Sequence, residues 1–342
     1  MHSEAHVIQR SGGRPRRPPI QRLISAAAPL LIIGSLVYAA FFVKAEVRID
    51  AIKTPPIERR DAFYGLAVPK SGVIWAVGSY GKIVRSSDAG KAWTIQSSPV
   101  DVHLQSIAAW DEQRAVAVGN QGRIIVTSDA GSTWREVQAP RSEVATKLVK
   151  VRALPDGSAW AVGELGAVLR STDAGVTWSR ALPEKDQAWN DIFFVGSDGW
   201  LVGEFGHVMR TRDGGKSWEQ SASPSKPSLM SVYFRDAMHG IAVGLSGTVL
   251  ESKDGGGSWQ LVPAVTREHL NHVGWDGGRW IAVGDKGIRV SGDGGSWKGA
   301  RITEQDLSWR TQAVVMDGQL VLAGANLATL DQDKLHIFGR PR

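Results

Sequence analysis

Six aspartates recur in short segments of one form, and their type and spacing could carry chemistry. Each segment reads S/T-x-D-x-G-x-S/T-W or a close variant, and we name these segments the Asp-boxes. An aspartate in such a turn accepts hydrogen bonds from its own backbone, and the glycine permits a positive φ. A catalytic or calcium-binding role would require six equivalent sites. We therefore interpret all six as structural: Asp88, Asp129, Asp173, Asp213, Asp254 and Asp293, the last in a box one residue short.

Two glutamates suggest a different chemistry. Glu164 and Glu204 occupy the same position of G-E-x-G turns in adjacent repeats, and Asp285 stands at that position in a third turn. Equivalent turns of a repeated fold lie on one face, so the two carboxylates could approach the ~6.5–9.5 Å that inverting glycoside hydrolysis requires. The other interpretation is that this turn simply takes a polar residue. We expect that the chain has no catalytic residues; the alternative is that Glu164 and Glu204 are catalytic.

The next position of these turns is apolar and bulky in three repeats. Such side chains either form an exposed anchor for a protein partner or pack into the interior. Arginine also recurs at one position of a predicted strand, where it either forms a basic patch or stacks on tryptophan. The candidate partner-binding residues are Tyr80, Leu165, Phe205, Arg85, Arg170 and Arg210.

Metal and cofactor chemistry has little support in the sequence. The chain has no cysteine, which excludes disulfides, thiolate metal sites and thiol catalysis. His269 and His272 have H-x-x-H spacing, but no third ligand accompanies them. The segment 215–217, Gly-Lys-Ser, resembles the end of a phosphate-binding loop, yet Arg210 stands where that motif requires glycine. We expect no metal and no cofactor.

These residues belong to a repeat that is marked by a glycine after an apolar run. The repeat is seven-fold, and most copies have four short strand-like segments separated by Gly and Asp turns, which is typical of a propeller blade. We predict an all-β, seven-bladed β-propeller over residues 60–342. Either residues 45–52 or residues 335–338 would complete the last blade. The marking glycines are Gly78, Gly119, Gly163, Gly203, Gly244, Gly284 and Gly324.

Charge is concentrated before the repeats. Residues 1–44 contain six basic residues and one acidic residue, whereas the rest of the chain is nearly neutral, which argues against nucleic-acid binding. An uncharged run of 21 residues, 23–43, has the length of a single membrane-spanning helix. The preceding arginines predict a cytoplasmic tail over 1–22, and residues 44–59 form a linker. The propeller would then lie in the periplasm, anchored in the bacterial inner membrane or, if the run is a signal peptide, released from it.

The repeat unit W-A-V-G-x-x-G-x-[IV]-x-R-[ST]-x-D-[AG]-G-x-[ST]-W resembles the repeats of photosystem II assembly and stability factors, which are similar to bacterial neuraminidase (BNR) repeat proteins. The resemblance covers roughly residues 60–340. It implies a non-enzymatic propeller on the lumenal or periplasmic side that helps a membrane complex assemble. Bacterial relatives without a photosystem accompany transporters of the resistance-nodulation-division (RND) type.

Two functional hypotheses follow from the sequence. The first is a scaffold or accessory factor for an integral membrane protein complex, with an RND-type transporter preferred over a photosynthetic complex. That preference follows from the missing lipoprotein cysteine of the cyanobacterial members, because a hydrophobic run stands in its place. The alternative is a polysaccharide-acting glycoside hydrolase of the Asp-box propeller type.

Overall fold

A computed structural model describes residues 19–43, 54–144, 147–292, 296–332 and 334–339. The chain divides into two compact units, residues 1–53 and residues 54–342. The first unit contains one helix, α1 (Pro19–Phe42). Across the described ranges, no helix combines the length and the apolar character needed to cross a membrane. The structure therefore does not support the predicted membrane-spanning helix over 23–43.

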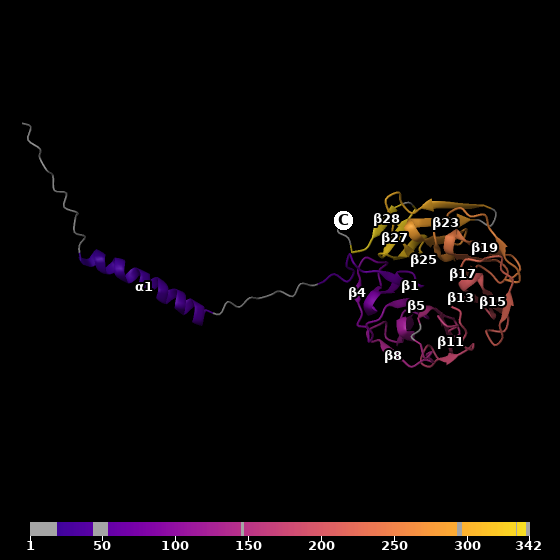
Figure 1. The fold of residues 1–342 in the computed structure, drawn as a ribbon, viewed down its shortest axis with the longest axis horizontal. Coiled ribbons are helices and arrows are strands. Elements are labelled where there is room, and N and C mark those ends of the chain that lie inside the picture. The colour runs from indigo at the N-terminus through magenta and orange to yellow at the C-terminus, as the bar shows by residue number, and fades with distance from the viewer. Residues whose placement is uncertain (1–18, 44–53, 145–146, 293–295, 333, 340–342) are drawn as a thin grey trace, which may run out of the picture. The chain divides into compact units, whose positions relative to one another are not determined.

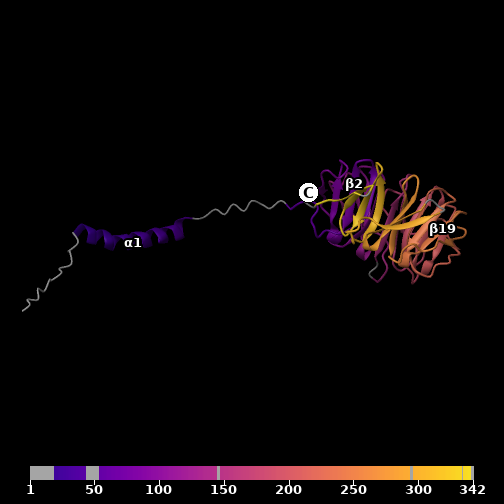
Figure 2. The same ribbon diagram turned by 90° about the horizontal axis from the view of Figure 1, so that it is seen from above.

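The second unit confirms the predicted all-β, seven-bladed propeller. Seven four-stranded antiparallel sheets follow one another around a ring, and each sheet is built from consecutive strands (Figure 1). Turned by 90°, β2 and β19 appear on opposite sides of the ring (Figure 2). Blades one to three consist of β1 (Phe63–Lys70), β2 (Val73–Gly78), β3 (Ile83–Ser86), β4 (Thr94–Ile95), β5 (Leu104–Ala109), β6 (Ala115–Gly119), β7 (Ile124–Thr127), β8 (Arg135–Val137), β9 (Leu148–Ala153), β10 (Ala159–Gly163), β11 (Val168–Ser171) and β12 (Ser179–Arg180).

The remaining four blades repeat the same order. In every blade the first strand is innermost and the fourth lies at the outer edge. Their strands are β13 (Trp189–Val195), β14 (Asp198–Gly203), β15 (Val208–Thr211), β16 (Glu219–Ser221), β17 (Leu229–Phe234), β18 (Gly240–Gly244), β19 (Val249–Ser252), β20 (Gln260–Leu261), β21 (Leu270–Trp275), β22 (Trp280–Gly284), β23 (Ile288–Gly292), β24 (Trp297–Arg301), β25 (Arg310–Met316), β26 (Gln319–Gly324), β27 (Ala328–Asp331) and β28 (Lys334–Ile337).

The ring closes by packing between blades seven and one. Strand β28 supplies the outer strand of blade seven, whereas residues 45–52 lie outside the described residues. Gln312 accepts a hydrogen bond from the backbone N–H of Leu66 at 2.9 Å and donates to its carbonyl at 3.1 Å. Phe63 and Phe338 belong to one buried apolar cluster that spans the two blades. Among the described residues, side chains from blades one and seven therefore hold the ends of the ring together.

The glycine that ends each second strand lies too close to another backbone segment to carry a side chain. A Cβ on Gly163 would stand 2.0 Å from the carbonyl oxygen of Lys147, and a Cβ on Gly244 would stand 2.1 Å from that of Ser228. The residue after the glycine then donates its N–H to this same carbonyl, as Glu164 does to Lys147 at 3.0 Å. The same close approach occurs in all seven blades, which explains the period of the repeat.

The Asp-boxes form compact turns between the third and fourth strands. In blade two, Asp129 accepts hydrogen bonds from the backbone N–H of Thr133 at 2.9 Å and from the hydroxyl of Thr127 at 2.8 Å. The hydrogen bond from the Thr133 hydroxyl is the main cause that lowers the pKa of Asp129. Asp88, Asp173, Asp213 and Asp254 have similar surroundings. Asp293 lies outside the described residues.

Each of the five described Asp-boxes also contacts the preceding blade. Gly215 of blade four lies against Trp160 of blade three, where a Cβ would stand 2.3 Å from the ring. The indole of Trp200 donates a hydrogen bond to the carbonyl of Gly255 in blade five at 3.0 Å. The boxes thus fasten their own hairpin and also fill the boundary between two sheets.

A belt of side chains from the innermost strands joins neighbouring blades around the central channel. The side chain of the third residue in these strands often accepts a hydrogen bond from a backbone N–H of the innermost strand in the next blade. The Ser106 hydroxyl accepts from the N–H of Val151 at 3.2 Å, and the Ser231 hydroxyl accepts from the N–H of Val273 at 3.3 Å. We name this set the inner belt: Gly65, Ser106, Lys150, Asp191, Ser231, His272 and Gln312.

The charged part of the inner belt lies in blades three and four. Asp191 is fully buried and accepts hydrogen bonds from Arg152 at 3.1 Å and from the Ser231 hydroxyl at 2.8 Å. Burial lowers the pKa of Lys150 to about 8 from its ordinary 10.5, although Asp191 opposes this shift. Burial also keeps the pKa of His272 well below 6.5, so that its neutral ring accepts the N–H of Ala313 at 3.4 Å.

We predict that Gly163→Ala destabilises the propeller by about 3 kcal/mol, because the new methyl group forces apart two backbone segments. Chemical denaturation compared with wild type measures this loss. Gly274→Ala is the matched control, since its Cβ would meet nothing closer than 3.7 Å and the residue lies in a strand. Equal stability of the two variants would contradict the role assigned to the close approach.

Lys150 makes the stability depend on pH in the alkaline range. Between about pH 8 and 10.5 the unfolded chain binds a proton at Lys150 that the folded chain has lost. Stability should therefore rise with pH across this interval, and Lys150→Met should remove that contribution and stabilise the protein at pH 7 by on the order of 1 kcal/mol. Urea unfolding at pH 7 to 10 tests the difference, with exposed Lys226→Met as control. Parallel pH profiles of wild type and Lys150→Met would refute it.

Candidate partner-binding face

The turns between the second and third strands form the candidate site. In blade one, Tyr80 and Gly81 both have positive φ, 53° and 70°, and Lys82 donates its N–H to the Ser79 carbonyl at 3.0 Å. This is the pattern of a type I′ hairpin turn, which favours asparagine or glycine at its first central position. Blades one to six place another residue there: Tyr80, Gln121, Leu165, Phe205, Ser246 and Lys286.

The turns of blades one, three, four, five and six are clamped to the loop that leads into the next blade. The N–H of Gly81 bonds to the carbonyl of Val102 at 2.7 Å, and a Cβ on Gly81 would stand 2.0 Å from the Val100 carbonyl. In blade six the N–H of Gly287 bonds to Ser308 at 2.8 Å in the same way. The second glycine of the turn therefore has no space for a side chain, and the turn is held rigidly. We name the surface formed by these turns and loops the turn face.

Two aromatic side chains project from the turn face into solvent. Tyr80 is 80% exposed and Phe205 is 70% exposed, more than any other large hydrophobic residue in the described part of the propeller. Leu165 is only partly exposed. A bulky residue with positive φ costs roughly 1 kcal/mol or more. The fold therefore gains little from the exposed position of these two side chains.

An aromatic cluster that the sequence analysis missed extends the surface around Tyr80. The Tyr80 and His103 rings are 4.8 Å apart, and Tyr64 stacks on Trp309 at 5.9 Å. These residues come from blades one, two and seven and lie beside the ring closure. Leu307, in the loop before blade seven, is 61% exposed. His103 and Trp309 occupy the same repeat position, before the innermost strand, but the residue type varies there, and the cluster forms only when the ends of the ring meet.

The two candidate carboxylates bond to the backbone of their own blades. Glu164 accepts the N–H of Lys147 at 2.9 Å, and Glu204 accepts the N–H of Ala188 at 2.8 Å. Both bonds hold the residue that leads into the innermost strand. At the same position Asp285 accepts a hydrogen bond from Asn271 at 3.1 Å. The structure thus gives the two glutamates the same structural contact on the turn face, whereas Asp285 has a different partner.

The candidate arginines lie away from the turn face. Arg85 is stacked over Trp75 at 4.9 Å, and Arg170 is stacked over Trp160 at 5.1 Å. Arg85 also donates to the carbonyl of Glu112, in the turn between β5 and β6 at the opposite end of blade two. Arg210 forms an ion pair with Glu219 of the neighbouring strand. The structure does not bring the arginines together with Tyr80, Leu165 and Phe205.

Among the described residues, no three His, Cys, Asp or Glu side chains lie close enough together to hold a metal ion. The two histidines with H-x-x-H spacing have separate partners: His269 accepts the N–H of Ser246 at 3.0 Å, and His272 belongs to the inner belt. The residues of the 215–217 segment belong to the Asp-box of blade four.

Comparison with known proteins supports the resemblance of the repeats. The family model described as Photosynthesis system II assembly factor YCF48 matches residues 93–186 and 158–226. No curated protein matches the chain at the level of sequence.

Solved structures share the ring at low sequence identity. YCF48 bound to a D1 peptide aligns with a TM-score of 0.65 and 16% identity, over 79% of this chain and 92% of the other. YCF48 from Cyanidioschyzon merolae aligns with a TM-score of 0.63 and 13% identity, over 78% and 93%. A GH74 xyloglucanase from Xanthomonas campestris aligns with a TM-score of 0.66 and 12% identity, over 82% of this chain but 54% of the enzyme. Together, the family match and the shared ring identify the chain as a seven-bladed propeller built from repeats like those of the photosystem II assembly factor YCF48.

Proposed function

We propose that the chain is a non-enzymatic protein-binding propeller that assists the assembly or operation of a membrane protein complex. The turn face is the surface that engages the partner. The observation that carries this proposal is the pair Tyr80 and Phe205, whose large apolar side chains are exposed from rigid turns that would be more stable with another residue.

A solved structure with the same fold supports a peptide or protein as the ligand of this chain. YCF48, at 16% identity, has been solved with a D1 peptide bound. We extend only the kind of ligand to this chain, because such a likeness establishes the fold and leaves the client open. A preformed face with aromatic anchors suits a protein partner, since it binds without an ordering cost in the propeller.

The client and the location rest on the sequence alone. We propose an integral membrane protein complex as the client, with an RND-type transporter as the specific candidate. We also propose that the propeller acts in the bacterial periplasm, on the basis of the charge asymmetry of residues 1–44.

The proposed face can be tested by giving its turns the residue that they favour. Tyr80→Asn and Phe205→Asn, alone and combined, should leave stability unchanged or raise it by up to about 1 kcal/mol for each turn, because asparagine accepts positive φ. The combined variant should recover at least tenfold less of an integral membrane partner from detergent-solubilised membranes. Quantitative mass spectrometry of co-purified proteins measures this recovery.

Gln121→Asn is the matched control, because it makes the same change in the turn of blade two without removing an apolar anchor. It should keep the partner. Recovery of the same partners by wild type, the combined variant and the control would contradict a role for the turn face. Recovery of no integral membrane protein by wild type would contradict the proposed class of client.

A glycoside hydrolase remains the second candidate, because a GH74 xyloglucanase shares the ring. Glu164→Gln and Glu204→Gln test it with little risk to folding, since the amide oxygen still accepts the N–H of Lys147 or Ala188. If the chain is a binding protein, the wild type should hydrolyse no member of a panel of glycans. Turnover that either substitution abolishes would establish the hydrolase instead.

A further inference from the structure

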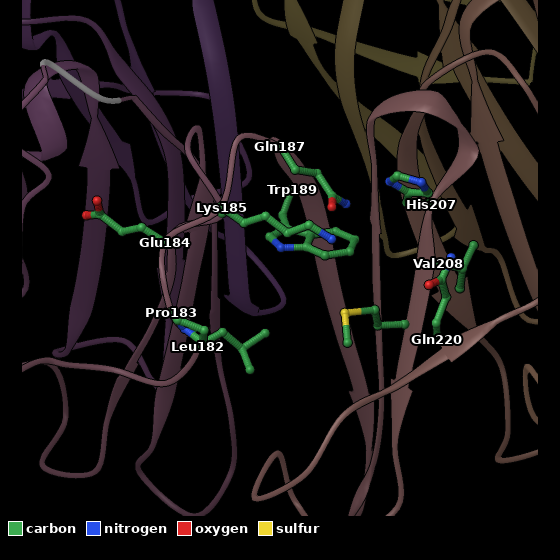
Figure 3. Close-up of a pocket in the computed structure, with 11 residues that line it drawn as sticks. Leu182, Pro183, Glu184, Lys185, Gln187, Trp189, His207, Val208 and Gln220 are labelled. Atoms are coloured by element: carbon green, nitrogen blue, oxygen red, sulfur yellow. The ribbon is translucent and has the colours of Figure 1, made fainter.

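A cavity of about 280 Å³ lies between blades three and four. The loop between β12 and β13 forms one wall, and the start of β15 with the neighbouring β16 forms the other (Figure 3). Gly166, which follows Leu165 in its turn, lines the cavity, and so does His207, which is near Phe205 with ring centroids 6.5 Å apart. The cavity therefore lies beside two turns of the turn face.

The wall of the cavity is mainly apolar. Leu182 and Pro183 come from the loop, Trp189 comes from the innermost strand, and Met209 comes from β15. Glu184 pairs with the nearby Arg180 at 2.8 Å, and Lys185 also lines the cavity. Pockets for drug-sized ligands occupy about 300–1,000 Å³. A slightly smaller and mainly apolar cavity suits one uncharged side chain with its adjoining main chain.

Two polar atoms of the wall lack a hydrogen-bond partner within the described protein. Gln187 is 6% exposed, and its buried Nε2 has no acceptor. Nδ1 of His207 is likewise buried and unpaired. Figure 3 shows the Gln187 amide and the His207 ring on facing sides of the cavity, next to Trp189. An unpaired buried amide is unfavourable, so a ligand that supplies an acceptor would recover the lost free energy.

The backbone holds Gln187 in place. Its N–H bonds to the carbonyl of Lys185 at 2.7 Å, and its carbonyl accepts the N–H of Gly166, so the residue is fixed between the loop and the turn. The neighbouring outer strand β12 has only two residues, which offers almost no edge for an added strand. A peptide would therefore bind here through an inserted side chain.

We propose that this cavity binds one apolar side chain of an extended segment of the protein partner, while Gln187 Nε2 donates a hydrogen bond to a main-chain carbonyl of that segment. The inference rests on the proposed function and adds a specificity pocket to it. Phe205 and Leu165 contact the flanking residues of the same segment, and His207 supplies the second polar contact. Charged side chains are excluded by the apolar wall.

Methionine methyl signals provide a direct reporter. The chain has five methionines, of which Met209 lines the cavity and Met238 is exposed after β17. The full chain carrying ¹³C-methyl methionine is titrated with N-acetyl-leucine N-methylamide, its phenylalanine analogue and its aspartate analogue. Met209→Leu assigns the signal. We expect the leucine or phenylalanine probe to shift the Met209 signal, Met238 to remain unchanged, and the aspartate probe to have no effect.

Gln187→Leu separates recognition from packing. The substitution removes an unpaired buried donor at similar volume, so thermal unfolding should occur at the same temperature or higher. The apolar probe should nevertheless bind at least fivefold more weakly, because its carbonyl loses the donor. Gln260→Leu, on the exposed strand β20, is the matched control and should bind as wild type does.

Three results would overturn the proposal: no shift of Met209 with either apolar probe up to its solubility limit, an equal shift with the aspartate probe, or unchanged affinity in Gln187→Leu. Each concerns the isolated chain and is independent of partner recovery by the Tyr80 and Phe205 variants. Failure of the cavity can therefore be distinguished from failure of the turn face.

Discussion

The propeller depends on seven points where two backbone segments approach more closely than a Cβ atom permits. Gly163 and its six equivalents occupy these points, and the N–H that follows each glycine bonds to the carbonyl before the innermost strand. Every innermost strand has a register shift at its second residue, directly after this contact. The shift sets the face on which the third residue lies, and so places the inner belt. The same glycine precedes the turn that presents Tyr80 or Phe205.

Much of the fold could be predicted because its constraints act locally and recur. A glycine at a position with no space for a side chain must appear in each repeat. Asp129 and the hydroxyl groups that bond to it lie within one short segment, so the sequence alone shows them together. Seven copies therefore predict seven blades. The prediction of a membrane-spanning helix over residues 23–43 had no such repetition to support it, since it rested on the length of the run and its lack of charge. The described helix does not meet the requirement for spanning a membrane.

The inner belt and the cavity could not be predicted in the same way, because their residues meet only after the ring forms. The belt contains glycine, serine, lysine, aspartate, histidine and glutamine at one strand position, so no residue type marks it. His272 attracted notice through its spacing from His269, yet its partner is Ala313 in the next blade. Gln187 looks like an ordinary loop residue until Gly166 and His207 enclose it. An alignment of the seven repeats would reveal the belt position as small or polar, but not its partners.

Stability and binding compete at the turn face, and this competition is the strongest physical argument for its function. An asparagine would suit the turn at Phe205 better, and a leucine would suit the buried site of Gln187 better. Phe205 and Gln187 lie beside the same cavity, although residues other than glycine also take positive φ in the Asp-box turns of blades one to three, at Ala89, Ala130 and Ala174. Tyr80 and Phe205 differ from these alanines because each combines a positive φ with a large apolar side chain in solvent. A partner can bury an exposed ring but gains little from an exposed alanine, so the proposed function assigns the cost at these two turns to binding.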